Sequence, residues 1–112
     1  MEIQVREHVV RAQIIKISGR LEAFTVGGLR DRQEQLIGAG EKYFVVDLRQ
    51  TTFMDSAGMS ALVSLLKRAR QAGGDVVLVR PSHAKAYRIL TLTRFDQVFT
   101  MVEDIGAALE LF

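Results

Sequence analysis

Cysteine is absent from this sequence of 112 residues. Its absence excludes disulfide bonds, a thiol nucleophile and zinc sites built from thiolates. No stretch approaches the ~20 consecutive apolar residues that a membrane-spanning helix needs, and residues 1–6 lack the apolar run of a signal peptide. We therefore expect a cytoplasmic protein that makes no contact with a membrane.

The motifs of several enzyme classes are missing as well. The sequence has no phosphate-binding loop, no dinucleotide-binding fingerprint and no Gly-x-Ser-x-Gly motif. Its two histidines, His8 and His83, fall in an expected turn and at an expected helix start, where neither is placed to activate a serine. Asp47 and Asp55 are explained by a strand end and a helix cap, and no pair of ligands has the spacing of a known metal site. We expect no enzymatic activity, no metal and no cofactor.

Positive and negative charges nearly balance. The chain has 15 Lys and Arg against 13 Asp and Glu, a formal net charge of +2, and the basic residues are spread among the acidic ones. This pattern indicates a solvated surface of mixed charge and no nucleic-acid partner. An apolar fraction of 48% is typical of globular proteins. The length suits one domain, residues 1–112, with a modest core.

Strands and helices are expected to alternate in the order β-β-α-β-α-β-α-β-α. The predicted positions are strands at 9–10 and 14–17, a helix at 25–38, a strand at 43–48, a helix at 59–72, a strand at 75–79, a helix from 82, a strand at 98–102 and a helix from 103. A turn around residues 6–8 would join the first two strands as an antiparallel hairpin. Thr25, Ser82 and the pair Glu103-Asp104 are the expected helix caps.

The segment at 43–48 is apolar almost throughout and contains aromatic and β-branched residues. A strand of this kind is typically covered on both faces, as in a parallel sheet with helices on each side. With the alternating order of elements, it predicts a single α/β domain with a mixed, mostly parallel sheet.

Asp55 and Ser56 stand between this strand and the next helix, where the first free N–H groups of a helix need partners. The residues alone favour a capping role for Ser56. Its position at the positive end of the helix dipole would also stabilise a phosphate. The helix that follows has an apolar stripe formed by Met59, Leu62, Val63, Leu66 and Ala69.

The segment Phe53-Met54-Asp55-Ser56-Ala57-Gly58-Met59 resembles the signature of the STAS domain family, in particular the bacterial anti-sigma factor antagonists. The resemblance covers nearly the whole chain and implies the STAS fold. It also implies that a partner anti-sigma factor kinase phosphorylates Ser56. The residues that it places at the partner interface are Glu22, Asp55, Ser56, Ala57, Gly58, Met59 and Ser60.

Two positions depart from the family pattern. Glu22 stands where the antagonists carry an aspartate, which keeps the charge on a longer side chain. Arg94 stands where the family usually has glycine.

The resemblance implies regulation by partner switching. The unmodified protein would bind the kinase and release a sigma factor, phosphorylation of Ser56 would disrupt that complex, and a phosphatase would reset it. The protein itself would be a monomer or a weak dimer. The alternative is a STAS module of another system, such as a stress-signalling assembly, a regulator of secretion or of a cyclase, or a lipid-transporter subunit. A small nucleotide-binding domain is a further, weaker alternative.

Overall fold

The computed structural model describes residues 1–112. Its elements are, in order, β1 (Gln13–Lys16), β2 (Gly19–Leu21), α1 (Val26–Gly38), β3 (Tyr43–Asp47), β4 (Thr51–Met54), α2 (Ser56–Gln71), β5 (Asp75–Val79), α3 (Ala84–Leu92), the 3-10 helix η1 (Phe95–Gln97), β6 (Thr100–Val102) and α4 (Ile105–Leu109). The predicted α/β fold class is confirmed.

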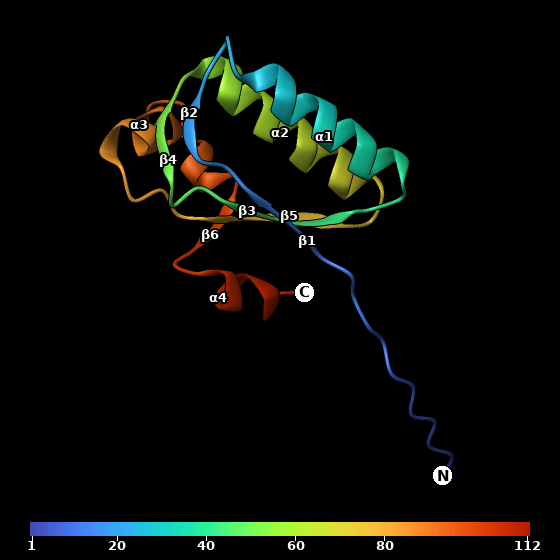
Figure 1. Ribbon diagram of the computed structural model, residues 1–112. Helices are drawn as coiled ribbons and strands as arrows, with labels where there is room; N and C mark the ends of the chain where they lie inside the picture. Colours follow the sequence, from blue (N-terminus) through green and yellow to red (C-terminus); the bar gives the residue numbers. More distant parts are fainter.

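All strand pairs in the molecule are parallel. β1, β3, β5 and β6 form one sheet in the order β1-β3-β5-β6, and β2 pairs with β4 in a separate two-stranded sheet. Helices α1 and α2 cover one face of the larger sheet and α4 lies on the other (Figure 1). Parallel strands need this cover because both of their faces are apolar.

The core is built around the two central strands, β3 and β5. Phe44 and Val46 of β3 pack in the larger apolar cluster with α2, whereas Val45 packs with Val77 and with Ala108 of α4. Successive residues of a strand point to opposite faces, so one continuous apolar run supplies both clusters. The strand predicted at 43–48 and the one at 75–79 are confirmed.

The expected N-terminal hairpin is wrong. Residues 1–12, here called the N-terminal arm, contain no strand, and β1 pairs in parallel with β3. The second strand is β2, in a segment predicted as a loop, and β4 occupies the segment predicted as a short connection before α2. These two short strands stabilise each other across a long sequence separation, so neither carries a periodic pattern of its own.

One expected helix cap, Ser82, is wrong, because His83 holds the N-cap position of α3. Thr25 holds the N-cap position of α1 as predicted, but its hydroxyl donates to the carbonyl of Arg20 and makes no capping hydrogen bond to the helix. Asp104 does cap α4, because its Oδ1 accepts a hydrogen bond from the N–H of Ala107 at 2.7 Å. None of the helices has the length and apolar character required to span a bilayer.

Candidate functional site

The predicted site residues meet where β2, β4 and α2 come together, at one end of the domain (Figure 1). β4 ends at Met54, and α2 begins two residues later at Ser56. The Ser56 and Ser60 side chains are exposed, one turn apart on α2, and Ala57 is half-buried. The strand and helix therefore present Ser56 to solvent at the N-terminus of a 16-residue helix.

Asp55, and not Ser56, is the cap of α2. Its Oδ1 accepts a hydrogen bond from the N–H of Gly58 at 3.0 Å. The interpretation of Ser56 as a simple cap is therefore wrong, because the preceding carboxylate already performs this role. Ser56 is the first helical residue, and its hydroxyl is free of a capping duty.

The second oxygen of Asp55 reaches a different part of the chain. Oδ2 accepts a hydrogen bond from the N–H of Ala23 at 3.1 Å, which ties the loop after β2 to the start of α2. The Gly58 N–H contributes most to lowering the pKa of the Asp55 carboxyl; partial burial opposes it, and the N–H groups of Ala23 and Ala57 lower the pKa further. A carboxylate in such a cradle stays ionised and holds both segments in place.

The hydrogen bond between Ala23 and Asp55 places the neighbouring residue, Glu22, at the site. The carboxylate of Glu22 turns back on its own loop, where Oε1 accepts a hydrogen bond from the N–H of Phe24 at 3.1 Å. The backbone N–H of Glu22 donates to the hydroxyl of Thr25 at 3.0 Å, which fixes the turn. The Phe24 side chain is 95% exposed at the tip of this loop. Sequence analysis missed Phe24; only its place beside Glu22 could have indicated it.

Gly58 and Met59 lie beneath the exposed surface. A Cβ atom on Gly58 would lie 2.6 Å from the carbonyl oxygen of Leu21, so only glycine allows α2 to approach β2 this closely. Met59 is 2% exposed and belongs to the larger core cluster. Both residues position the site, and the side chains within reach of a partner are those of Glu22, Ser56, Ala57 and Ser60.

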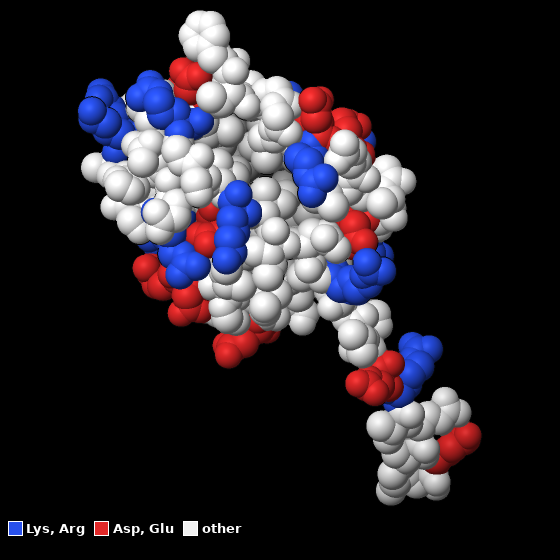
Figure 2. Space-filling model, in the orientation of Figure 1, with Lys and Arg blue, Asp and Glu red and all other residues white.

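A groove of about 560 Å³ beside Ser56 carries three basic side chains: Arg20 of β2 and Lys85 and Arg88 of α3. The Arg20 guanidinium lies 4.3 Å from the centre of the Phe53 ring, a cation–π contact. Figure 2 shows Lys and Arg side chains gathered over the end of the domain where α3 and β4 lie. Sequence analysis missed this cluster, because its members come from segments far apart in the chain.

A second, smaller groove of about 260 Å³ runs from Ser56 along the other side of α2. It is lined by Ser56, Met59, Ser60, Val63, Thr93 and Phe95. Ser56 therefore lies between a basic groove and a mainly apolar one. Such a surface has the polar and apolar contacts that a docked protein needs.

Neither histidine lies in the two grooves beside Ser56. His8 is on the N-terminal arm and His83 precedes α3. The chain holds no group of three or more His, Cys, Asp or Glu that could bind a metal ion. The site combines an exposed hydroxyl, a helix N-terminus and neighbouring basic side chains.

A comparison with protein-family models identifies the family of this chain. The model of the STAS domain matches residues 1–108. The chain belongs to the STAS family. An anti-sigma F factor antagonist of Paenibacillus polymyxa is 25% identical over 99% of this chain and 97% of its own. A STAS-domain containing protein of Pseudomonas aeruginosa is 31% identical over 76% of this chain and 82% of its own.

A solved structure agrees with this assignment. The crystal structure of an anti-sigma factor antagonist from Mycobacterium paratuberculosis superposes with a TM-score of 0.79. The match covers 96% of this chain and 90% of the other, at 20% identity. The predicted resemblance to STAS anti-sigma factor antagonists is thus confirmed in both sequence and fold.

Proposed function

We propose that this STAS domain is an anti-sigma factor antagonist that acts by partner switching, with Ser56 as its phosphorylation site. In the unmodified state it binds an anti-sigma factor kinase through the exposed start of α2 and the loop around Glu22. This binding releases a sigma factor in the cytoplasm. The observation that carries the proposal is the exposed Ser56 hydroxyl at the head of α2, left free because Asp55 caps the helix.

The domain is the substrate of the phosphorylation and not its catalyst. The Ser56 oxygen forms a bond to the γ-phosphorus of ATP, the bond to the β-phosphate oxygen breaks, and ADP leaves. The kinase supplies ATP, Mg²⁺ and the base that takes the hydroxyl proton. A phosphatase hydrolyses the ester to return serine and inorganic phosphate. This division of roles fits an exposed hydroxyl at the N-terminus of α2, where an incoming phosphate is favoured.

The free domain has several features that stabilise a phosphate at Ser56. The group carries a charge of about −1.5 to −2, and the helix N-terminus favours negative charge. Arg20, Lys85 and Arg88 line the groove beside it. We therefore expect phosphorylation to leave the fold unchanged.

The phosphate weakens the complex between this domain and the kinase. An interface over Ser56 would remove the dianion from water next to the Asp55 carboxylate and near Glu22. Removing an ion from water costs several kcal/mol even where opposite charges are near, and roughly 1.4 kcal/mol corresponds to a tenfold loss of affinity. The phosphate therefore dissociates the complex without unfolding the domain.

The test is a titration of the anti-sigma factor kinase from the source organism with Ser56 variants, measured by calorimetry without ATP. Ser56→Ala should bind as tightly as the unmodified protein, whereas Ser56→Glu should bind at least tenfold more weakly. With ATP, mass spectrometry should find one phosphate on the wild type at Ser56 and none on Ser56→Ala.

Gln71→Glu is the matched control, because it adds the same charge to an exposed position at the far end of α2. It should bind like the wild type. Equal affinities of Ser56→Ala and Ser56→Glu would contradict the electrostatic switch, and a phosphate on any other residue would contradict the assignment of Ser56.

A further inference from the structure

The basic groove beside Ser56 carries a positive charge that no carboxylate of the chain neutralises. Arg20, Lys85 and Arg88 line it together with one acidic residue, Asp55, so its formal net charge is +2. None of the three basic side chains forms an ion pair or donates a side-chain hydrogen bond. Both oxygens of Asp55 already accept hydrogen bonds from backbone N–H groups. A ligand with two negative charges would neutralise this groove.

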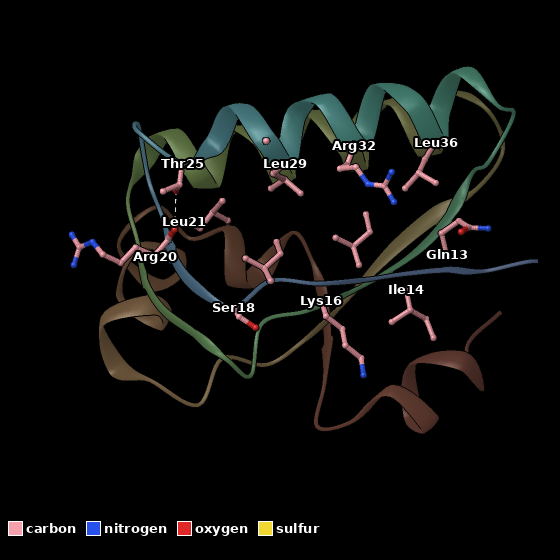
Figure 3. Close-up of a pocket in the computed structure, with 13 residues that line it drawn as sticks. Gln13, Ile14, Lys16, Ser18, Arg20, Leu21, Thr25, Leu29, Arg32 and Leu36 are labelled. Carbon is pink, nitrogen blue, oxygen red and sulfur yellow. Dashed lines mark hydrogen bonds between the residues drawn. The ribbon is translucent and has the colours of Figure 1, made fainter.

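Two contacts hold Arg20 in place at the groove. Its backbone carbonyl accepts a hydrogen bond from the Thr25 hydroxyl at 2.7 Å, and its guanidinium lies 4.3 Å from the centre of the Phe53 ring. Figure 3 looks into another groove, between β1 and α1, and shows the Arg20 side chain directed out of it. A planar guanidinium held in this way loses little freedom when it binds an anion.

The other two cations of the groove belong to α3. Lys85 and Arg88 are both exposed, and they are three residues apart, which places them on one face of the helix. Helix α3 packs against β4, and β4 ends two residues before Ser56. This packing brings both side chains into the groove that Ser56 also lines.

We propose that this groove holds the phosphate of phosphorylated Ser56. The inference rests on the proposed function, because Ser56 must first be esterified. The phosphate carries a charge of about −1.5 to −2, which matches the net charge of the groove. Its oxygens accept hydrogen bonds from the guanidinium groups of Arg20 and Arg88 and from the ammonium group of Lys85. The ester bond keeps the phosphate at a high effective concentration beside these groups.

Binding in the groove prolongs the life of the phosphorylated state. A phosphatase has to draw the phosphate away from three cations before water can attack its phosphorus atom. The ester is therefore hydrolysed more slowly than an unpaired phosphate, and the partner stays dissociated for longer. Arg20, Lys85 and Arg88 are positioning residues that set how long this state lasts.

Other charged groups also surround the phosphate. The carboxylates of Asp55 and Glu22 oppose its negative charge. Arg30 of α1 donates a hydrogen bond to the hydroxyl of Ser60 at 3.5 Å, and Arg94 lies between two residues of the smaller groove. Neither of these arginines lines the basic groove. Arg30 therefore provides a control for a nearby positive charge outside it.

The first test measures the second pKa of the phosphate by phosphorus NMR, with phosphoserine placed at position 56 during translation. Cations in contact favour the dianion, so this pKa should lie about 1 pH unit below its ordinary value of about 6. Arg20→Gln combined with Lys85→Gln and Arg88→Gln should raise the pKa by at least about half a pH unit. Each single variant should raise it by less.

Arg30→Gln is the matched control and should raise the pKa of the phosphate less than the triple variant does. Circular dichroism checks that every variant is folded, as expected for substitutions of exposed side chains. An unchanged pKa in the triple and single variants, or an equal rise with Arg30→Gln, would overturn the proposal.

The second test follows hydrolysis of the ester by alkaline phosphatase at about pH 8, where the phosphate of every variant is a dianion. The reaction releases inorganic phosphate and restores the Ser56 hydroxyl. Release should be at least about threefold faster from the triple variant than from the wild type, because the phosphate is no longer held. Arg30→Gln should react at the wild-type rate. Equal rates for the triple variant and the wild type would contradict a phosphate held in the groove.

Phosphoserine placed at position 56 by translation separates this inference from the proposed function, because the titration needs no kinase. A kinase that leaves Ser56 unmodified would overturn the proposed function, and the pKa of the phosphate would still test the groove. A triple variant with an unchanged phosphate pKa but weaker binding of its unmodified form to the kinase would assign the groove to the partner. That result would also overturn the proposal.

Discussion

Two exposed regions of this molecule are held in very different ways. At the start of α2, the Asp55 carboxylate alone accepts hydrogen bonds from two segments of the chain. The whole N-terminal arm makes a single ion pair with the body and exposes Ile3 and Val5. Exposed polar groups on a fixed frame suit a partner that binds and is released, because little has to be ordered on binding. An extended segment held by so little would have to be ordered when a partner binds it, which costs conformational entropy.

The largest contrast should come from placing the same charge in each region. Met59 is 2% exposed beneath Ser56, so Met59→Lys would bury a charge without a partner and should lower the free energy of unfolding by more than about 3 kcal/mol. Val5→Lys, on the arm, should change it by less than about 0.5 kcal/mol, because this side chain is 93% exposed. Chemical denaturation followed by circular dichroism measures both values. Similar changes in the free energy of unfolding for the two variants would contradict the claim that the two regions are held differently.

Ser60→Lys is the control for the first variant, because it places lysine next to Met59 on the exposed face of α2. It should fold with nearly wild-type stability. If it were as unstable as Met59→Lys, the helix surface and not the core would be the sensitive element.

A smaller effect is expected from removing the carboxylate that fixes the site. Asp55→Ala should cost about 1–2 kcal/mol, because an N-cap is worth roughly that amount and the bond to Ala23 is lost with it. Asp104→Ala removes the cap of α4, which makes no second bond to a distant loop, and should cost less. Thermal or chemical unfolding compares the two. A larger loss for Asp104→Ala would show that the tie between the loop and α2 contributes nothing.

The same carboxylate gives a pH dependence. The pKa of Asp55 is lowered in the folded state, mainly by the Gly58 N–H. Its contribution is therefore complete above the unfolded pKa of about 3.9 and is lost as the pH falls through the folded value. The stability difference between wild type and Asp55→Ala should shrink steadily as the pH is lowered below about 4. Asp47, whose pKa is lowered above all by its bond to Arg49, remains in both proteins and cancels.

The sequence predicted β3, β5 and α2 correctly, because the pattern that indicates each of them lies within one short segment. The apolar runs of β3 and β5 are long and continuous, and the stripe along α2 follows the helical period. β2 and β4 were missed because they are only three and four residues long and stabilise each other at a distance. The strand predicted at residues 9–10 rested on two apolar residues alone, and the structure has no strand there.

The candidate site was predictable to the same extent. Asp55 and Ser56 are adjacent in sequence, so their place at a helix start followed from the pattern. The cap expected of Asp55 is present, whereas the capping role that the residues alone favoured for Ser56 is not. The basic groove was not predictable, because Arg20 and Arg88 meet only through the packing of α3 against β4.

Arg94 offers the smallest change, at the border of the site between Thr93 and Phe95 of the apolar groove. Its backbone has φ 60° and ψ 17°, the left-handed region that glycine adopts at little cost. This geometry explains why the family pattern has glycine there. Arg94→Gly relieves the strain but loosens the unfolded chain, so we expect a net stabilisation of about 0.5 kcal/mol. Arg94→Ala keeps the strain and should not stabilise; if it did so equally, removal of the positive charge and not of the backbone strain would be the cause.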